Sequence, residues 1–332
     1  MSNKLKKIST SFQQWLLLIV GIAFIVTLVF LGQYQTKLFT DSANNLLNIY
    51  IKDVRHDIMD VTDKNLLILT RAVATEVNNA DKITSELLTG MLEKYNVTEI
   101  NYFSSTGVIL ASSNADFVGY DIGRGGVQAS EFWALLGAIT EYVQRFQPIG
   151  FDAQKSRKYA GVTLAAGGFI QVGYDEEAYY RAIEVAINEV VKNRHVGESG
   201  FLIVTDSAWR IISDRANNKN QPVTIVTAMT KDLTTIGKDE MFEEGIYIDN
   251  TLQRCFCMHN EVEGYKVIAV YPYSEAMVSR NVSLKVMTVM QILIFGLLFV
   301  MIFLLVRRLI VKNLHQVNHA LSAITDGNLE TV

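Results

Sequence analysis

The chain contains very few cysteines, and this scarcity argues against two kinds of site. Only Cys255 and Cys257 occur among its 332 residues, too few for a disulfide framework or for a zinc site with four sulfur ligands. They are separated by one residue on a segment that we expect to be a strand, so both point to the same face. A disulfide between such neighbours would be strained, and we therefore favour two small, partly buried thiols over a redox pair.

An excess of positive charge and catalytic signatures are also missing. The formal net charge is -4, without the basic face that nucleic-acid binding normally requires. The glycine-rich stretches 123–126 and 165–168 lack the lysine and serine or threonine of a phosphate-binding loop and fit turns better. Hydrolase, zinc-protease and kinase signatures are absent, and a metal site at His315 and His319 is a minor alternative. We expect no enzyme activity within this chain, no cofactor, no metal and no nucleic-acid partner.

Long apolar runs are what the chain has in excess. Hydrophobic residues make up 49% of it, which is high for a soluble domain. The run from Val286 to Val306 holds one strongly polar side chain, Gln291, and is long enough to cross a hydrocarbon core of about 30 Å. We predict a transmembrane helix over residues 284–306.

A second apolar run, Trp15 to Gly32, follows a basic start. It resembles a secretion signal in this respect, but it is longer than a usual signal core and no small-residue cleavage site follows it. We therefore predict an uncleaved transmembrane helix over residues 15–34. Basic residues lie before the first span and after the second, which predicts cytoplasmic termini (1–14 and 307–332) and an extracytoplasmic segment, 35–283.

The segment after the second span has the pattern of a coiled-coil helix. Its apolar residues recur at alternating spacings of four and three, the a/d seam of a coiled coil, which predicts a signal relay and a homodimer: Ile310, Leu314, Val317, Leu321 and Ile324. The sequence I-T-D-G-N-L at Ile324–Leu329 resembles the end of the first helix of a HAMP domain, the linker of bacterial membrane receptors. Residues 307–332 would then be a partial HAMP, although the proline usual near its start is missing. The alternative is a juxtamembrane amphipathic helix of no particular family.

The extracytoplasmic segment begins with a predicted stalk helix over residues 41–79, which contains neither glycine nor proline. At roughly 1.5 Å per residue it would be about 58 Å long. Its apolar stripe could pack on its own domain, on a dimer partner or on both, and consists of Leu47, Ile51, Val54, Ile58, Val61, Ile68 and Ala72.

Two modules with alternating helix and strand signals follow the stalk. The distal module, 85–175, combines a helix at 85–95, a hairpin at 99–114, a short helix at 130–139 capped by Ser130, and strands around Tyr142, Tyr159 and Ile170. A linking helix at 176–195 leads to the proximal module, 197–281, whose opening strands around Asp206 repeat the distal hairpin. The fold class is α+β, with tandem PAS-like antiparallel sheets between two membrane spans.

This plan resembles a double Cache domain, the tandem PAS-like sensor that bacteria place between two membrane spans. The residues that carry the resemblance are Gly197–Phe201 leading into a strand-turn-strand, and Tyr271-Pro272-Tyr273 before the exit helix. The resemblance implies a chemoreceptor, histidine kinase, diguanylate cyclase or phosphatase whose output domain would follow Val332. It also implies a small-molecule ligand held between the distal sheet and its helical lid.

By position in the lid and strands, six residues are candidates for ligand binding: Phe132, Trp133, Tyr142, Arg145, Tyr159 and Asp175. Aromatic side chains would form an apolar wall, Arg145 would hold a carboxylate and Asp175 an ammonium group. Trp133 is equally well explained as a core residue, and the two charged residues as surface residues. Amino-acid-binding members of the family carry an arginine where Glu131 stands, so the resemblance does not imply amino-acid recognition.

Three functions follow from these observations. The first is a receptor input that senses an extracellular small molecule and passes a helix displacement to an output domain. The second is a membrane-anchored binding or adhesion module without signalling. The third, an enzyme acting outside the membrane, is disfavoured because no acid, base or metal set is clustered in the sequence.

Overall fold

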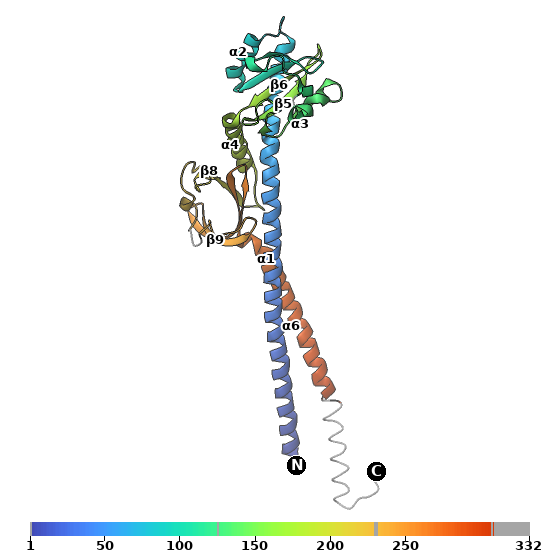
Figure 1. Cartoon of the computed structure of the whole chain (residues 1–332). Coiled ribbons are helices and arrows are strands. Elements are labelled where there is room, and N and C mark those ends of the chain that lie inside the picture. Colours follow the sequence, from blue (N-terminus) through green and yellow to red (C-terminus); the bar gives the residue numbers. More distant parts are fainter. Residues whose placement is uncertain (1, 125, 229–231, 307, 309–332) are drawn as a thin grey trace, which may run out of the picture. The chain divides into compact units, whose positions relative to one another are not determined.

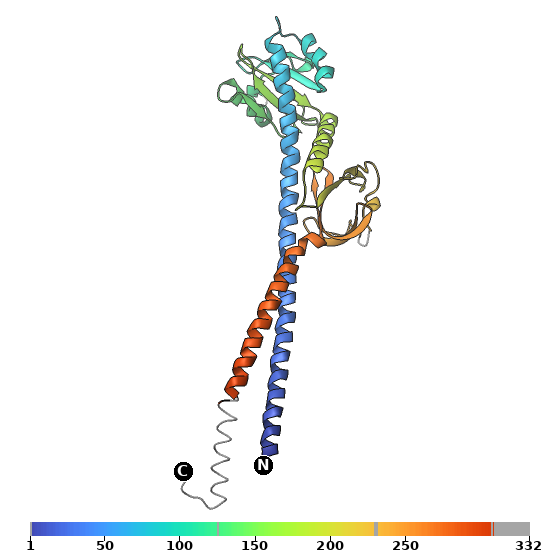
Figure 2. The same ribbon diagram turned by 180° about the vertical axis from the view of Figure 1, so that it is seen from behind.

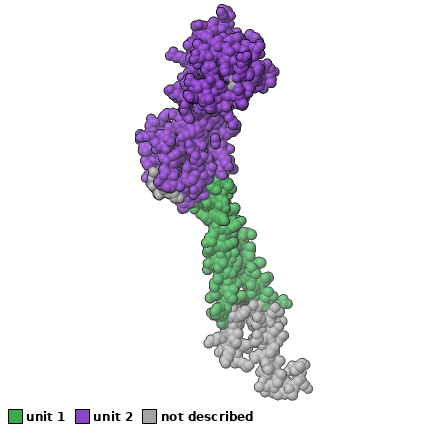
Figure 3. Space-filling view, viewed as in Figure 1, with its two compact units in different colours: residues 1–45, 272–332 green, residues 46–271 purple. Residues whose placement is uncertain are grey.

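A computed structural model describes the backbone of residues 2–124, 126–228, 232–306 and 308. The predicted relay residues of the HAMP-like helix lie outside the described residues: Ile310, Leu314, Val317, Leu321 and Ile324. The chain forms two compact units, a smaller one of residues 1–45 and 272–332 and a larger one of residues 46–271 (Figure 3).

Among the described residues, two helices are long and apolar enough to cross a membrane, judged by length and composition. They are α1 (Ser2–Asn78) and α6 (Val278–Val306), which follows the short α5 (Tyr273–Ala276). The most apolar windows of these helices have mean hydropathies of 2.8 and 2.7. The predicted stalk is not a separate element but the second part of α1, since neither glycine nor proline occurs between Gly32 and Gly90.

Within the smaller unit, α1 and α6 are joined by a polar contact between apolar helices. The side-chain amide of Gln291 donates to the backbone oxygen of Phe24 at 3.1 Å. The Phe24 ring meets Phe295 edge-on, with 5.5 Å between centroids. Gln291, the one strongly polar side chain between Val286 and Val306, therefore makes an interhelical contact, as polar side chains on packed apolar helices often do.

In the larger unit, one face of α1 is buried against the rest of the unit. Leu47, Ile51, Val54 and Ile58 are at most 1% exposed, as the predicted stripe requires. Beyond Ile58 the stripe does not pack on this unit as a whole, since Ile68 is 53% exposed. The buried positions there are Thr62, Leu66, Thr70, Val73, Ala74 and Val77.

The distal module contains a six-stranded antiparallel sheet, with α2 beside β1 and β2 and the lid helices over β5 (Figures 1 and 2). The strand order is β2-β1-β6-β5-β3, and β4 also pairs with β5. Helix α2 has the predicted start and end, and the strands fall where the sequence predicts them. The elements are α2 (Ser85–Tyr95), β1 (Glu99–Phe103), β2 (Ile109–Ser112), η1 (Ala115–Phe117), η2 (Ile122–Arg124), α3 (Gly126–Ser130), η3 (Glu131–Leu136), β3 (Glu141–Val143), β4 (Gln147–Pro148), β5 (Ser156–Thr163) and β6 (Phe169–Tyr174).

The lid differs from the single helix predicted over 130–139. It consists of α3 followed by the 3-10 helix η3, and the two meet at Ser130. Ser130 does not cap a helix, because its hydroxyl donates back to the oxygen of Val127 at 2.8 Å. Sequence analysis did not predict the break between α3 and η3, because a serine followed by an acidic residue is also the usual start of a helix.

The proximal module repeats the strand order of the distal one. Its sheet runs β8-β7-β11-β10-β9, so in both modules the first strand lies between the second and the last. Helix α4 packs on strands of both sheets, which confirms the predicted link. The elements are α4 (Glu176–Asn193), β7 (Phe201–Thr205), β8 (Ile211–Ser213), η4 (Val223–Ile225), β9 (Met241–Ile248), β10 (Thr251–Val262) and β11 (Tyr265–Pro272).

The two cysteines belong to the core of the proximal module. Cys255 and Cys257 point to the same face of β10 and are free thiols, each fully buried. Burial raises the pKa of Cys255 to about 12 and that of Cys257 well above its ordinary value. Thiols of this kind are inert packing groups, because the reactive form is the thiolate.

Candidate functional site

The distal sheet and its lid enclose a small cavity. It has a volume of about 30 Å³, enough for about one or two water molecules. Aromatic and aliphatic side chains form most of the wall, and polar side chains from the sheet form the rest. The lining residues are Glu99, Asn101, Phe103, Ile109, Phe117, Tyr120, Ile122, Gln128, Ala129, Phe132, Ile149, Phe151, Tyr159 and Gln171.

A glycine on β5 lets the lid lie close to the sheet. A Cβ at Gly161 would be 2.5 Å from Leu135 Cδ1 and 3.2 Å from the ring of Phe132, both on η3. Any larger residue at this position would therefore push the lid outward. Phe132 itself is fully buried and its ring is parallel to that of Phe169, with 6.0 Å between centroids.

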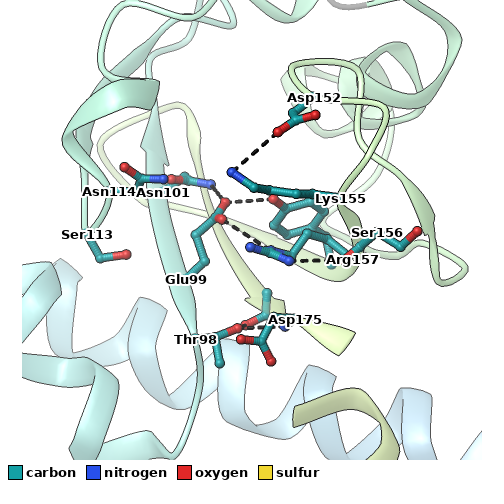
Figure 4. Close-up of polar contacts among 12 residues, drawn as sticks. Thr98, Glu99, Asn101, Ser113, Asn114, Asp152, Lys155, Ser156, Arg157 and Asp175 are labelled. Atoms are coloured by element: carbon teal, nitrogen blue, oxygen red, sulfur yellow. Dashed lines mark hydrogen bonds and ion pairs between the residues drawn. The ribbon is translucent and has the colours of Figure 1, made fainter. Parts of the chain in front are cut away.

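Glu99 is the single acidic residue in the cavity wall, and it is 3% exposed. Its Oε1 accepts hydrogen bonds from the Tyr159 hydroxyl and the Asn101 amide, each at 2.7 Å. Arg157 Nε lies 3.7 Å from Oε2, on the other side of the carboxylate (Figure 4). Burial raises the pKa of Glu99, while these hydrogen bonds and the Arg157 charge partly oppose the shift.

A polar network continues from Glu99 across the sheet. The amide of Asn101 also donates to Gln171 Oε1 at 3.0 Å, and its oxygen accepts from Ser112 Oγ at 2.6 Å. These groups come from β1, β2 and β6, so the network fixes side chains of three adjacent strands. A fully satisfied buried network of this kind holds its members in one arrangement.

Two polar atoms next to this network have no hydrogen-bond partner in the part of the chain that the structure describes. They are the Tyr120 hydroxyl, which belongs to the cavity wall, and Arg157 Nε. Buried polar atoms without a partner are rare, and each needs an explanation such as a water molecule or a ligand. The Tyr120 hydroxyl can hydrogen-bond to a molecule in the cavity, whereas Arg157 is not part of the lining and its Nε lies beside Glu99.

The six residues predicted from the sequence do not share one pocket. Phe132 and Tyr159 line the cavity, and their contact with a ligand stays a prediction. Tyr142 packs edge-on against Phe132, but its hydroxyl donates to Glu131 Oε2 at 2.9 Å.

The other three predicted residues lie elsewhere. Trp133 is 45% exposed on the outer side of η3. Arg145 is exposed and lines a separate pocket described below. Asp175 is the N-cap of α4, since its Oδ1 accepts a hydrogen bond from Ala178 N at 2.9 Å. An acidic residue directly before a helix is a common cap, and this local role explains Asp175 without a ligand.

Sequence reasoning missed most of the polar wall, including Glu99, Tyr120, Gln128 and Gln171. One signal was available: Glu99, Asn101 and Phe103 alternate along β1 and so share a face. An acidic residue on the inner face of a strand is unusual unless it is paired or functional. Glu131, noted from the sequence, holds the lid instead, because it accepts hydrogen bonds from Tyr142 and, at 2.7 Å, from Gln144 Nε2.

The raised pKa of Glu99 predicts a pH dependence of stability. The folded protein favours the protonated carboxyl, so its contribution is fully present below the ordinary pKa of 4.5 and is lost as the pH rises through the folded value. Glutamine at position 99 cannot ionise, so the Glu99→Gln variant does not lose this contribution to stability as the pH rises. The free energy of unfolding of the variant, measured by denaturant titration of the full chain at several pH values, is expected to fall less above pH 4.5 than that of the wild type. Equal slopes in Glu99→Gln and in the exposed control Glu93→Gln would contradict the assignment.

The known proteins that resemble this chain are found among solved structures. No protein-family model and no curated sequence matches the chain. Among solved structures, the sensory domain of the Campylobacter jejuni chemoreceptor Tlp3 with isoleucine bound is 13% identical, with a TM-score of 0.34 over 73% of this chain and 97% of that one. The periplasmic domain of RsbU from Chlamydia trachomatis is 11% identical, with a TM-score of 0.31 over 74% and 97%.

An extracellular ligand-binding receptor from Desulfohalobium retbaense is 13% identical, with a TM-score of 0.30 over 68% of this chain. The chain spans 39% of the length of that receptor. By name, these three structures are a sensory domain, a periplasmic domain and an extracellular ligand-binding receptor. Similarity at this level identifies no ligand.

Proposed function

We propose that the chain is the sensory input of a transmembrane receptor and that it binds a small molecule in the distal cavity. The observation that supports this most is the composition of the cavity between sheet and lid. It combines aromatic walls with a buried acid, Glu99, and a Tyr120 hydroxyl that has no partner among the described residues. A concave, mostly apolar site with a few convergent polar groups is the usual form of a small-molecule site.

The lining indicates the chemistry of the ligand. Among the described residues that form the wall, Glu99 is the one acid and no basic side chain is present. The site therefore favours a ligand that donates hydrogen bonds, such as an amine, over a free carboxylate. Its apolar part would pack against Phe132 and Phe151, which line the same cavity. A volume of about 30 Å³ is too small for such a ligand, so binding requires the lid to move outward.

A chain of contacts connects the lid to α1. Glu131 on η3 accepts a hydrogen bond from Tyr142 on β3. The neighbouring residue on β3, Glu141, binds Arg71 of α1 through two hydrogen bonds of 2.6 and 2.5 Å. Outward movement of the lid would act on β3 and, through this bidentate pair, on α1. A bias of about 1–3 kcal/mol between two positions of the helix is enough to change output severalfold.

The remaining features of the proposal concern the membrane. The basic residues near both ends favour two spans with residues 35–283 outside and both termini in the cytoplasm. The predicted coiled-coil helix favours a homodimer, since its apolar seam would otherwise face water. The receptor would act on an output module of the phosphatase, diguanylate cyclase, histidine kinase or chemoreceptor type.

A ligand screen on the full chain in lipid nanodiscs tests the proposal. Amines, amino acids, carboxylates, purines and sugars are added, and the unfolding midpoint is followed, because a ligand of the folded state raises it in a concentration-dependent way. We expect a hit among the amine-bearing compounds. Its affinity should fall about tenfold or more in Glu99→Gln, as for loss of a charged hydrogen bond, and stay unchanged in Trp133→Ala, which alters the outer side of the lid. A well-folded protein that responds to none of the compounds would contradict direct sensing at this site.

A further inference from the structure

A second and much larger pocket lies in the larger unit, where five segments meet. Its walls come from α1, from the segment between β3 and β4, from β5, from α4 and from the turn between β10 and β11, and its volume is about 530 Å³. It shares no lining residue with the distal cavity. We call it the junction pocket, because both modules contribute to its wall.

The floor of the junction pocket is aromatic. The Phe146 ring is stacked on the ring of Tyr179, with 4.2 Å between centroids and an interplanar angle of 3°. Tyr179 is fully buried, and its hydroxyl lies 4.0 Å from the sulfur of Met59. These side chains offer an apolar surface to the body of an organic molecule.

The wall of the junction pocket contains both acidic and basic side chains, and these differ in whether they have partners. The acids of the wall have partners: Asp60 lies 3.4 Å from His56, Asp63 binds Lys158, and Glu263 pairs with the Tyr179 hydroxyl. Three cations of the wall make no hydrogen bond or ion pair with any residue that the structure describes, namely Lys52, Arg55 and Arg145. The lining holds four lysine or arginine side chains and three carboxylates, so it carries a small positive excess, and three of the cations are without a partner among the described residues.

Lys158 connects the pocket to α1. Its side chain is 1% exposed, and its ammonium contacts Asp63 Oδ1 on α1 at 2.5 Å. An anion in the pocket would compete with Asp63 for this ammonium. Occupancy of the pocket and the position of α1 are thereby linked through one ion pair, in which the ammonium is buried and the carboxylate is partly exposed.

We propose that the junction pocket binds a small organic anion with two or more carboxylate or phosphate groups. Arg145, Lys52 and Arg55 would hold the anionic groups, and the Phe146 ring would pack on the body of the molecule. The site is separate from the amine-favouring distal cavity in position and in charge. It would let a second kind of molecule act on the same helix.

Direct binding to the full chain in nanodiscs of zwitterionic lipid tests this proposal. Citrate and pyrophosphate are the probes, one for carboxylates and one for phosphates, and binding is measured by calorimetry. The unfolding midpoint is not a suitable readout, since such anions also stabilise folded proteins by exclusion from their surface. Hydrogen exchange with and without probe locates the site, and slower exchange is expected in residues 52–63 and 144–158.

The matched pair of variants is Arg145→Gln and Arg215→Gln. Both remove an exposed arginine, but Arg215 lies outside the pocket lining. We expect Arg145→Gln to weaken binding of at least one probe by about tenfold or more, as for loss of a charged hydrogen bond, and Arg215→Gln to leave it unchanged. Equal affinities in the two variants, or no binding of either probe up to about 10 mM, would overturn the proposal. Glu99→Gln should leave anion binding intact, so a failure of the distal site is distinguishable from a failure of this one.

Discussion

Asp63→Ala is expected to lower the free energy of unfolding of the larger unit by about 2–3 kcal/mol. Removing Asp63 leaves the buried ammonium of Lys158 with one remaining acceptor, the backbone oxygen of Gln144 at 3.2 Å. The carboxylate of Asp63 is 40% exposed, so water reaches part of the vacated position and keeps the effect below that of a fully enclosed pair. The measurement is denaturant unfolding of the full chain, followed by a probe of the larger unit.

Two further variants show whether the buried charge is the cause. Asp60→Ala removes another acid of α1, whose contact with His56 is largely exposed, and should change stability by less than about 0.5 kcal/mol. Asp63→Ala combined with Lys158→Met should be more stable than Asp63→Ala alone, because no unpaired ammonium is then buried. If Asp63→Ala and Asp60→Ala have the same effect, the ion pair of Asp63 with Lys158 does not stabilise the fold.

Gly168→Ala is expected to destabilise the larger unit by about 3 kcal/mol or more, through steric overlap and backbone strain. Gly168 lies in the turn before β6 with φ of +75°, and a Cβ there would be 2.0 Å from the backbone oxygen of Phe103. Neither atom can move without disturbing the pairing of Phe103 with Phe169 between β1 and β6. Thermal unfolding should show a midpoint lower by about 6 °C or more, at about 2–4 °C per kcal/mol for a unit of this size.

Gly119→Ala is the matched control for this substitution. Gly119 also has a positive φ, +87°, but a Cβ there would have no atom within 4 Å. It should cost about 1 kcal/mol from backbone strain alone. The difference between the two variants then measures the overlap with Phe103, and equal midpoints would show that the turn before β6 relaxes freely.

Much of the fold was predictable from the sequence because local patterns and tertiary packing agree. Helix α2 starts after Thr84, which caps it, and ends before Asn96 in a left-handed conformation, so both ends carry their usual signals. The strands of each sheet follow apolar alternation and glycine turns. The repeat of the opening hairpin in the second module was also visible, and the two sheets share one strand order.

The candidate site was less predictable, since its residues meet only after the sheet has formed. Glu99 and Tyr159 are far apart in the chain, and their hydrogen bond depends on the pairing of β1, β6 and β5 in that order. Position in the predicted lid and strands favoured Trp133 and Arg145, which are large or charged. Their orientation is set by the short 3-10 helix and the β3–β4 segment, whose geometry no sequence period indicates.

The buried hydroxyls of α1 have a mechanical consequence. Thr62 and Thr70 face the interior, yet each donates to a backbone oxygen of its own helix, to Ile58 and Leu66, at 2.8 Å. A small slide of the helix along its axis therefore breaks no hydrogen bond at these two positions. Ion pairs at separate levels restrain such a slide: Asp53 with Arg194, Asp63 with Lys158, and Arg71 with Glu141. Along this buried face, α1 is therefore held in position by ion pairs at separate levels and not by hydrogen bonds of its buried hydroxyls.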